Sequence, residues 1–152
     1  MDVGLWNKTW SRKYERYNRH HQAIWEAVLP FLRGKVVDLG CGPSVMYEGK
    51  NIDLTGVDWS EEGLKQAKLH YPQGKFILAE ATDTGLPSCS FDTVIMLGLL
   101  DYFDDWEKVL KEARRLMKPG GQIIGTLLHG FNGHDWKSYP HITGNWHFVK
   151  IC

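Results

Sequence analysis

The chain has 152 residues, of which 43% are hydrophobic, and this size and composition suit one globular core and argue against several domains. Its 18 lysines and arginines balance 18 aspartates and glutamates, so a formal net charge of zero gives no overall attraction to nucleic acid. No apolar run approaches the roughly 20 residues that cross a bilayer, and the amino terminus lacks the apolar core of a signal peptide, so we expect a cytoplasmic protein without a membrane partner.

The first predicted element is a helical region that runs from Trp10 to Leu32, within residues 1–34. Apolar side chains recur there at steps of three and four residues, and Pro30 and Gly34 mark its end. The segment also carries aromatic and basic side chains that suit either a lid over a ligand or a solvated helix face: Arg12, Lys13, Tyr14, Arg16 and Tyr17.

Five apolar runs with strand character follow, at residues 35–39, 52–57, 75–79, 91–97 and 122–128. Several lack polar alternation, which is typical of strands covered on both faces. Helices are predicted after the second strand, between Ser60 as a cap and Pro72, and after the fourth strand, from Trp106 to Met117. The third and fourth strands are joined by ATDTGLPSCS, which has turn chemistry. This alternation predicts a Rossmann-like, doubly wound, mostly parallel α/β sheet.

A glycine turn, VVDLGCGPS, follows the first predicted strand. In an open α/β sheet, ligands bind at the carboxyl ends of the strands, and Gly40 and Gly42 lack the Cβ atoms that would keep a ligand off the main chain. A dinucleotide site would have a third glycine at the place of Val45. Asp38 would repel a phosphate, so it favours a ligand with a positive charge.

A second acid, Asp58, closes the run LTGVDWS at the predicted end of the second strand. Its carboxylate can accept hydrogen bonds from both hydroxyls of a ribose, and the neighbouring Trp59 can cover an adenine face. We expect loss of the Asp58 side chain to weaken binding and leave the fold intact. Each feature also has a plainer interpretation: the glycines as a tight turn, Asp58 as an acid at a helix N-terminus and Trp59 as core packing.

Four segments in this order resemble the class I S-adenosylmethionine-dependent methyltransferases of the small-molecule type: VVDLGCGPS, LTGVDWSEEGLKQA, AEATDTGLPSCSFDTVIM and LKEARRLMKPGGQIIGTLL. The resemblance spans residues 35–128. It implies that a methyl group passes by in-line displacement from S-adenosylmethionine to a small-molecule acceptor, with S-adenosylhomocysteine as the product. One alternative is a cofactor-binding module without independent catalysis that completes or regulates a partner. A weaker alternative is a nucleotide domain of the dehydrogenase type.

The resemblance also implies which residues meet the cofactor and which could act as a base. Many small-molecule members of the family carry a histidine where this chain has Tyr102, which is a departure from the pattern. The implied cofactor contacts form four groups: Asp38, Gly40, Cys41 and Gly42 at the methionine and sulfonium end; Asp58 at the ribose; Trp59, Glu80 and Ala81 at the adenine, with Asp83 as an alternative to Glu80; and Leu97 and Gly98 after the fourth strand. The candidate bases at the carboxyl edge of the sheet are Tyr102 and His129.

The carboxyl-terminal segment, residues 129–152, is short for such a family. Trp146 to Ile151 can supply one edge strand, and we expect no complete antiparallel pair. The chain is therefore predicted to form one C-terminally shortened domain, with residues 35–128 as the cofactor-binding core. Few residues remain to wall the acceptor site, so a homo-oligomer or a partner subunit could complete it. After the fourth strand the sequence lacks the Asn-Pro-Pro-aromatic or Asp-Pro-Pro-aromatic tetrad of many amino-group methyltransferases that act on nucleic acid bases or glutamine. It also lacks the Pro-Cys nucleophile of cytosine methyltransferases. Both absences favour a small molecule over nucleic acid as the acceptor.

Cysteines and histidines give no metal site. The three cysteines have no close pair, which is typical of free thiols in a reducing compartment: Cys41, Cys89 and Cys152. Four histidines near the carboxyl end have spacings that fit no usual ligand set: His129, His134, His141 and His147.

Overall fold

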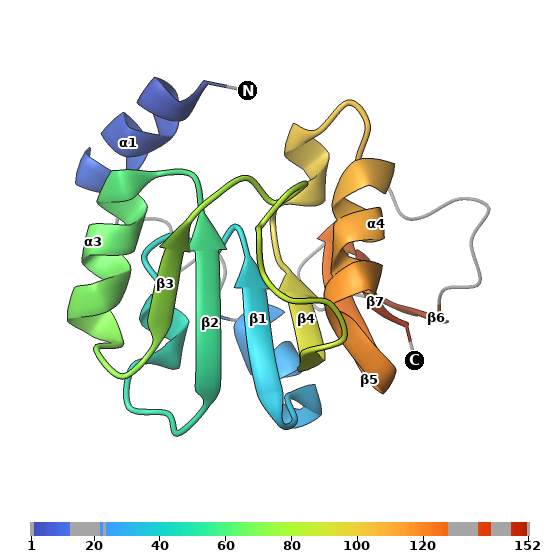
Figure 1. Ribbon diagram of the computed structural model, residues 1–152. Coiled ribbons are helices and arrows are strands. Elements are labelled where there is room, and N and C mark those ends of the chain that lie inside the picture. The colour runs from blue at the N-terminus through green and yellow to red at the C-terminus, as the bar shows by residue number, and fades with distance from the viewer. Residues whose placement is uncertain (1, 13–21, 23, 128–136, 141–146, 152) are drawn as a thin grey trace.

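A computed structural model describes residues 2–12, 22, 24–127, 137–140 and 147–151 of the chain (Figure 1). Its centre is a seven-stranded sheet with the order β3-β2-β1-β4-β5-β7-β6. Strands β1 to β5 pair in parallel, and β7 pairs antiparallel with β5 and β6, so the predicted Rossmann-like, mostly parallel sheet is confirmed. The strands are β1 (Lys35–Leu39), β2 (Asp53–Asp58), β3 (Lys75–Leu78), β4 (Phe91–Met96), β5 (Met117–Leu127), β6 (Lys137–Pro140) and β7 (His147–Ile151).

Helices and short 3-10 turns connect these strands. They are α1 (Val3–Arg12), η1 (Leu29–Phe31), η2 (Val45–Tyr47), α3 (Glu61–His70), η3 (Leu100–Tyr102) and α4 (Glu107–Leu116), with residues 24–28 helical before η1. The predicted cap of α3 is confirmed, because the Ser60 hydroxyl accepts a hydrogen bond from the Gly63 amide at 3.1 Å. The segment between β3 and β4 contains no helix, as predicted. None of the helices in the described ranges has the length and apolar content of a membrane-spanning segment.

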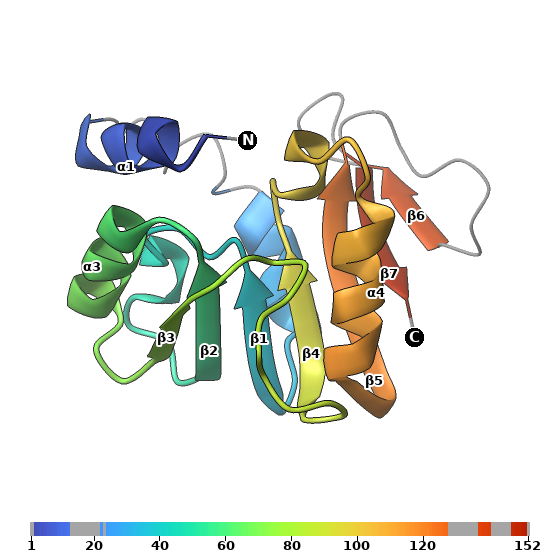
Figure 2. The ribbon, with the colours of Figure 1, turned by 45° about the horizontal axis from the view of Figure 1, so that its top comes forward.

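The amino-terminal helical region differs from its prediction. The structure begins α1 at Val3, seven positions before the predicted start at Trp10, and residues 13–21 and 23 lie outside the described part of the chain. The proposed lid residues Lys13, Tyr14, Arg16 and Tyr17 fall in that range, and nothing is described of the Arg12 side chain. In the described part of this region, α1 lies beside α3, above the carboxyl ends of β2 and β3 (Figure 2).

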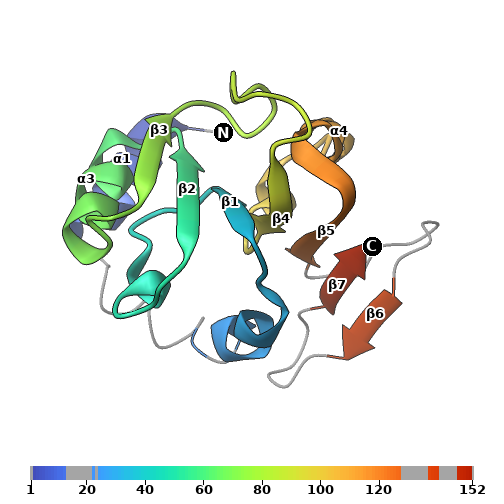
Figure 3. The same cartoon turned by 60° about the horizontal axis from the view of Figure 1, so that its bottom comes forward.

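Two apolar layers cover the central sheet, one on each face. Side chains of a strand point alternately to opposite faces. On one face, Val37 and Val94 pack with α4 residues such as Leu110. On the other face, Val36 packs with Trp25 of the segment before η1. Figure 3 shows α4 and that segment on opposite sides of the sheet, which explains why the strand sequences lack polar alternation.

Two predictions at the carboxyl end of the fold are wrong. Strand β5 starts directly after α4 at Met117, and not at Gln122 as predicted. Its register with β4 shifts between Phe91 and Thr93, and this irregularity accommodates Gly120 and Gly121 within the strand. The antiparallel pair that the sequence did not predict is formed by β6 and β7 (Figure 3). It was missed because the four-residue β6 contains a proline, which edge strands tolerate.

Candidate functional site

A cavity of about 390 Å³ opens at the carboxyl ends of the central parallel strands. This volume lies within the roughly 300–1,000 Å³ of small-molecule sites. Among the described residues that line it, aromatic rings combine with carboxylates, and none is a lysine or an arginine. The lining residues are Trp6, Trp10, Gly40, Val57, Asp58, Trp59, Ala79, Glu80, Ala81, Gly98, Leu99, Tyr102, Phe103 and Asp104. Such a surface suits a flat ligand that carries hydroxyl groups or positive charge.

The glycine turn after β1 has the backbone that the sequence predicts. Gly40 has φ of +72° and Gly42 has φ of +48°, a region that glycine adopts at little cost. The amides of Gly40 and Cys41 both donate to the carbonyl of Val57 on β2, at 2.8 and 3.0 Å. A Cβ on Gly40 would stand 2.7 Å from Leu99 Cδ1, so any side chain at this wall of the cavity would have to displace Leu99.

Asp58 ends β2 and faces the cavity, although only 7% of it is exposed. Its two carboxylate oxygens accept hydrogen bonds from the amides of Gly42 and Ser60, each at 2.8 Å. Burial raises its pKa, and the backbone hydrogen bonds counteract part of that rise. The carboxylate therefore joins the glycine turn to the start of α3. Its removal would deprive two buried amides of their acceptor, so we now expect a loss of stability in addition to the loss of binding.

Asp38 lies one strand away and lines a separate cavity of about 20 Å³. All four residues expected at the methionine end of the cofactor line this smaller cavity: Asp38, Gly40, Cys41 and Gly42. Its other lining residues are Ile24, Met46 and Leu97. Asp38 is 3% exposed, and burial raises its pKa to about 7, with a hydrogen bond from Tyr47 lowering it and the nearby Asp58 raising it. Burial also raises the pKa of the Cys41 thiol well above its usual value, so this group stays protonated at neutral pH.

An aromatic roof from α1 is the part of the site that the sequence did not predict. The rings of Trp6 and Trp10 stack with centroids 5.6 Å apart, and Trp6 meets Tyr102 edge to face at 4.8 Å. The helix is docked by Asn7, whose side-chain oxygen accepts a hydrogen bond from the Ser60 hydroxyl at 2.6 Å. The spacing of four residues between the two tryptophans, which places both on one helix face, was the available signal.

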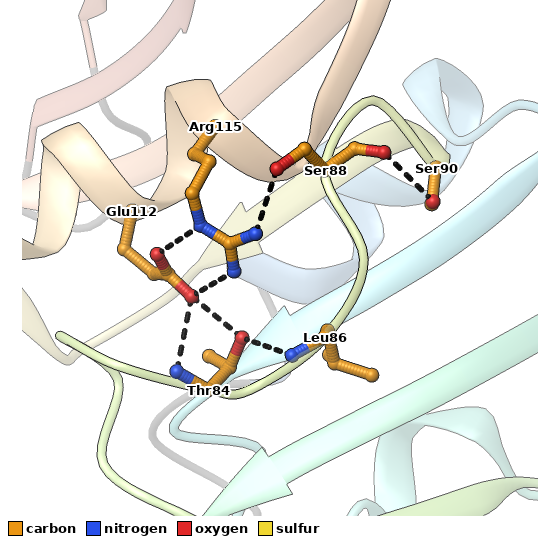
Figure 4. Close-up of polar contacts among 6 residues, drawn as sticks. All are labelled: Thr84, Leu86, Ser88, Ser90, Glu112 and Arg115. Carbon is orange, nitrogen blue, oxygen red and sulfur yellow. Dashed lines mark hydrogen bonds and ion pairs between the residues drawn. The ribbon is translucent and has the colours of Figure 1, made fainter.

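The loop between β3 and β4 brings two of the predicted adenine residues to the cavity. Glu80 and Ala81 line it, whereas Asp83, the alternative, is not among its lining residues. The same loop is fixed to α4 at Thr84, because Glu112 accepts hydrogen bonds from the backbone amide and the hydroxyl of Thr84 at 3.0 and 2.6 Å (Figure 4). The Arg115 guanidinium holds the pKa of Glu112 at about 2, well below its usual value.

The two candidate bases have different outcomes. Tyr102 lines the cavity, but burial and the charge of Asp101 raise its pKa, which keeps the phenol protonated and argues against a role as a base. His129 lies outside the described residues. Of the other histidines near the carboxyl end, His134 and His141 also lie outside them, and the backbone of His147 belongs to β7. In the described part of the chain, no group of three or more histidine, cysteine or acidic side chains could hold a metal ion.

Comparisons with known proteins agree with this geometry. The sequence model of a family described as methyltransferase domain matches residues 37–125. A ubiquinone biosynthesis O-methyltransferase of Thiobacillus denitrificans is 34% identical over 118 residues, which is 72% of this chain and 49% of that protein. One from Pseudomonas putida is 31% identical over 139 residues, or 82% of this chain and 60% of that protein.

The solved structures include a SAM-dependent methyltransferase of Thermotoga maritima with 26% identity and a TM-score of 0.72, and the match covers 84% of this chain and 62% of that one. The chain spans about half the length of the curated relatives it matches, with shares from 42% to 60%.

Proposed function

The chain belongs to the methyltransferase domain family, and from that premise we propose that it binds S-adenosylmethionine over Gly40 and transfers the methyl group to a small-molecule acceptor. One observation carries the proposal. Gly40 lines both the cavity of about 390 Å³ and the one of about 20 Å³, so a ligand lying against its bare main chain can enter both.

The residues present fit this cofactor at its two ends. In the larger cavity, Asp58 keeps free lone pairs for ribose hydroxyls, since each carboxylate oxygen can accept a second hydrogen bond. The smaller cavity is large enough for one ammonium-sized group, because a water-sized group needs only roughly 10–15 Å³. Asp38 is the acid beside that space, and its negative charge suits the amino group of the methionine end.

The protein contributes alignment and shielding to such a reaction. The bound cofactor would supply a methyl group on a positively charged sulfur. A lone pair of the acceptor would attack that methyl carbon in line while the carbon–sulfur bond breaks, so that S-adenosylhomocysteine leaves and the acceptor's proton passes to a base or to water. Alignment of two reactants is worth several kcal/mol in favourable cases, and the two carboxylates would supply it by fixing both ends of the cofactor. Trp6 and Tyr102, whose rings are in contact, both line the cavity and would shield a bound ligand from water on that side.

We propose a hydroxyl group as the acceptor, on a phenol or a similarly acidic molecule. The curated relatives named above are O-methyltransferases, which supports an oxygen acceptor. A phenol, with a pKa of about 10, gives up its proton more readily than an alcohol and so needs least from a base. Within the described part of the cavity, Tyr102 is a poor base, and His129 stays a prediction for that role.

Calorimetry and a radiolabelled methyl-transfer assay test the proposal together. Binding of S-adenosylhomocysteine to the whole chain, followed by transfer of labelled methyl to one member of a panel of phenols, is the expected result. Binding without transfer to any acceptor would favour the alternative of a cofactor-binding module that needs a partner subunit. Binding of a nicotinamide dinucleotide in place of S-adenosylhomocysteine would contradict the proposal.

A substitution at Asp58 tests the ribose contact. Asp58→Asn is expected to weaken S-adenosylhomocysteine binding more than about tenfold, because the amide keeps one acceptor oxygen and presents its NH₂ group where an acceptor is needed. Affinity is measured by calorimetry at a temperature at which circular dichroism shows a folded variant. The matched control is Asp53→Asn, an exposed acid at the opposite end of the same strand, which should bind as the wild type does. Equal affinities of the two variants would refute this role.

A further inference from the structure

A buried tyrosine stands behind the acid of the smaller cavity. The hydroxyl of Tyr47, on the 3-10 turn η2, donates a hydrogen bond of 2.7 Å to Oδ2 of Asp38. Neither residue is open to solvent, since Tyr47 is 0% and Asp38 is 3% exposed. The methyltransferase proposal assigns a contact to Asp38 and none to Tyr47.

Packing holds the tyrosine ring in one place. Its centroid lies 4.6 Å from the ring of Trp25 in an edge-to-face contact and 5.8 Å from the ring of Tyr71. The backbone of Ser44 at the start of η2 has φ of +54°, which turns the chain sharply after the glycine motif and brings Tyr47 back under β1. A hydroxyl fixed in this way can orient a carboxylate at little further entropic cost.

The groups around Asp38 determine how it titrates. In the part of the chain that the structure describes, the titratable groups brought against it are Tyr47 from η2, Asp58 from β2 and Cys41 from the turn. Asp58 disfavours a second negative charge nearby, and Cys41 is neutral because burial raises its pKa. Tyr47 alone favours the carboxylate, by donating to it. Burial and the charge of Asp38 raise the pKa of Tyr47 well above its usual value, so Tyr47 remains a donor at neutral pH.

We propose that Tyr47 is a positioning residue for cofactor binding, which holds the Asp38 carboxylate toward the smaller cavity so that the ammonium group of the ligand replaces a proton there. The inference rests on the proposed function, because it requires the methionine end of the cofactor in that cavity. Below neutral pH the carboxyl group carries a proton, the arriving ammonium keeps its own charge, and the carboxyl proton leaves to solvent.

A pH dependence of affinity follows from this exchange. Asp38 has a raised pKa of about 7 in the free protein, so the ligand must displace a proton at lower pH and meets an ionised carboxylate at higher pH. The affinity for S-adenosylhomocysteine should therefore rise with pH, about tenfold per unit below the midpoint, and level off above it. The same shift has the opposite effect on the free protein, which should lose stability as pH rises from the unfolded value of 3.8 towards 7.

The experiment measures S-adenosylhomocysteine affinity by calorimetry between about pH 5.5 and about pH 8.5, a range centred on the expected titration. Wild type should show a midpoint near 7 and release a proton on binding at the acid end. In Tyr47→Phe, loss of the donor should move the midpoint upward by about half a pH unit or more, because the hydrogen bond lowers the pKa of Asp38. Asp38→Asn should bind weakly at every pH.

The matched control is Tyr71→Phe, which also removes a buried tyrosine hydroxyl beside the same aromatic cluster. That hydroxyl accepts from the Ile52 amide at 2.9 Å and donates to the Ile52 carbonyl at 2.8 Å, and it does not touch Asp38. Its midpoint should equal that of the wild type, even if the variant is less stable. Affinity that does not change with pH, or equal midpoints in Tyr47→Phe and wild type, would overturn the inference and leave the proposed function standing. Absence of binding at any pH would overturn both.

Discussion

Replacement of Glu112 by alanine is expected to lower the free energy of unfolding by about 3 kcal/mol. The carboxylate is 6% exposed, and besides Thr84 it accepts hydrogen bonds of 2.7 and 2.6 Å from the guanidinium of Arg115 (Figure 4). Alanine would leave the buried Thr84 amide without its acceptor and remove the hydrogen bonds that tie the loop to α4 at Thr84. Since that loop carries Glu80 and Ala81, the affinity for S-adenosylhomocysteine should fall as well. Urea denaturation and calorimetry measure the two losses.

An exposed ion pair at the start of α4 provides the control, with Lys108 on the helix and Asp105 in the turn before it. Lys108 and Asp105 are three residues apart in sequence, as Glu112 and Arg115 are, and their charged atoms are 3.5 Å apart. Their side chains, however, are 71% and 56% exposed. Lys108→Ala should cost less than about 0.5 kcal/mol, since solvent already screens that pair. Similar losses in the two variants would mean that burial of Glu112 does not matter.

Acid titration gives an independent check on the same group. The folded pKa of Glu112 is about 2, below its ordinary 4.5, so ionised Glu112 stabilises the fold fully above pH 4.5. This contribution should be lost as pH falls from 4.5 towards 2. The difference in unfolding free energy between wild type and Glu112→Gln should therefore shrink over that range. A difference that stays constant down to acid pH would contradict the lowered pKa.

Gly40→Val is expected to abolish detectable binding of S-adenosylhomocysteine, a loss of more than about a hundredfold. The new Cβ would stand 2.7 Å from Leu99 Cδ1, and the rest of the side chain would enter the space over the main chain where the cofactor is proposed to lie. The backbone at φ of +72° also disfavours any β-branched residue. Calorimetry measures the binding, and thermal denaturation shows whether the variant folds.

Gly49→Val separates backbone strain from lost space. Gly49 has nearly the same φ, +71°, but a Cβ there would meet nothing within 4 Å. In both variants, a valine in the left-handed backbone region lowers the stability of the fold by roughly 1–2 kcal/mol. Only Gly40→Val should lose the cofactor, and a folded Gly40→Val protein that binds as Gly49→Val does would refute the proposed path of the ligand.

Local patterns in the sequence predicted most of the sheet and the turn beneath the proposed ligand. Strand β1 has the predicted bounds, the cap at Ser60 is in place, and both glycines of VVDLGCGPS have positive φ. These features depend on neighbouring residues, because alternation, capping and steric freedom operate over one or two turns of chain. The start of α1 at Val3 was missed because helix boundaries carry weak signals.

By itself, the sequence determined the parallel sheet, the position of its glycine turn and the acids Asp38 and Asp58 at the strand ends. Only the tertiary structure decided what those acids contact. The hydrogen bond from Gly42 to Asp58 spans 16 positions and that from Thr84 to Glu112 spans 28. Trp10, on α1, lies against Gly42 in the turn after β1. No local periodicity encodes such contacts, because they form when separate elements pack together and buried polar groups must find partners.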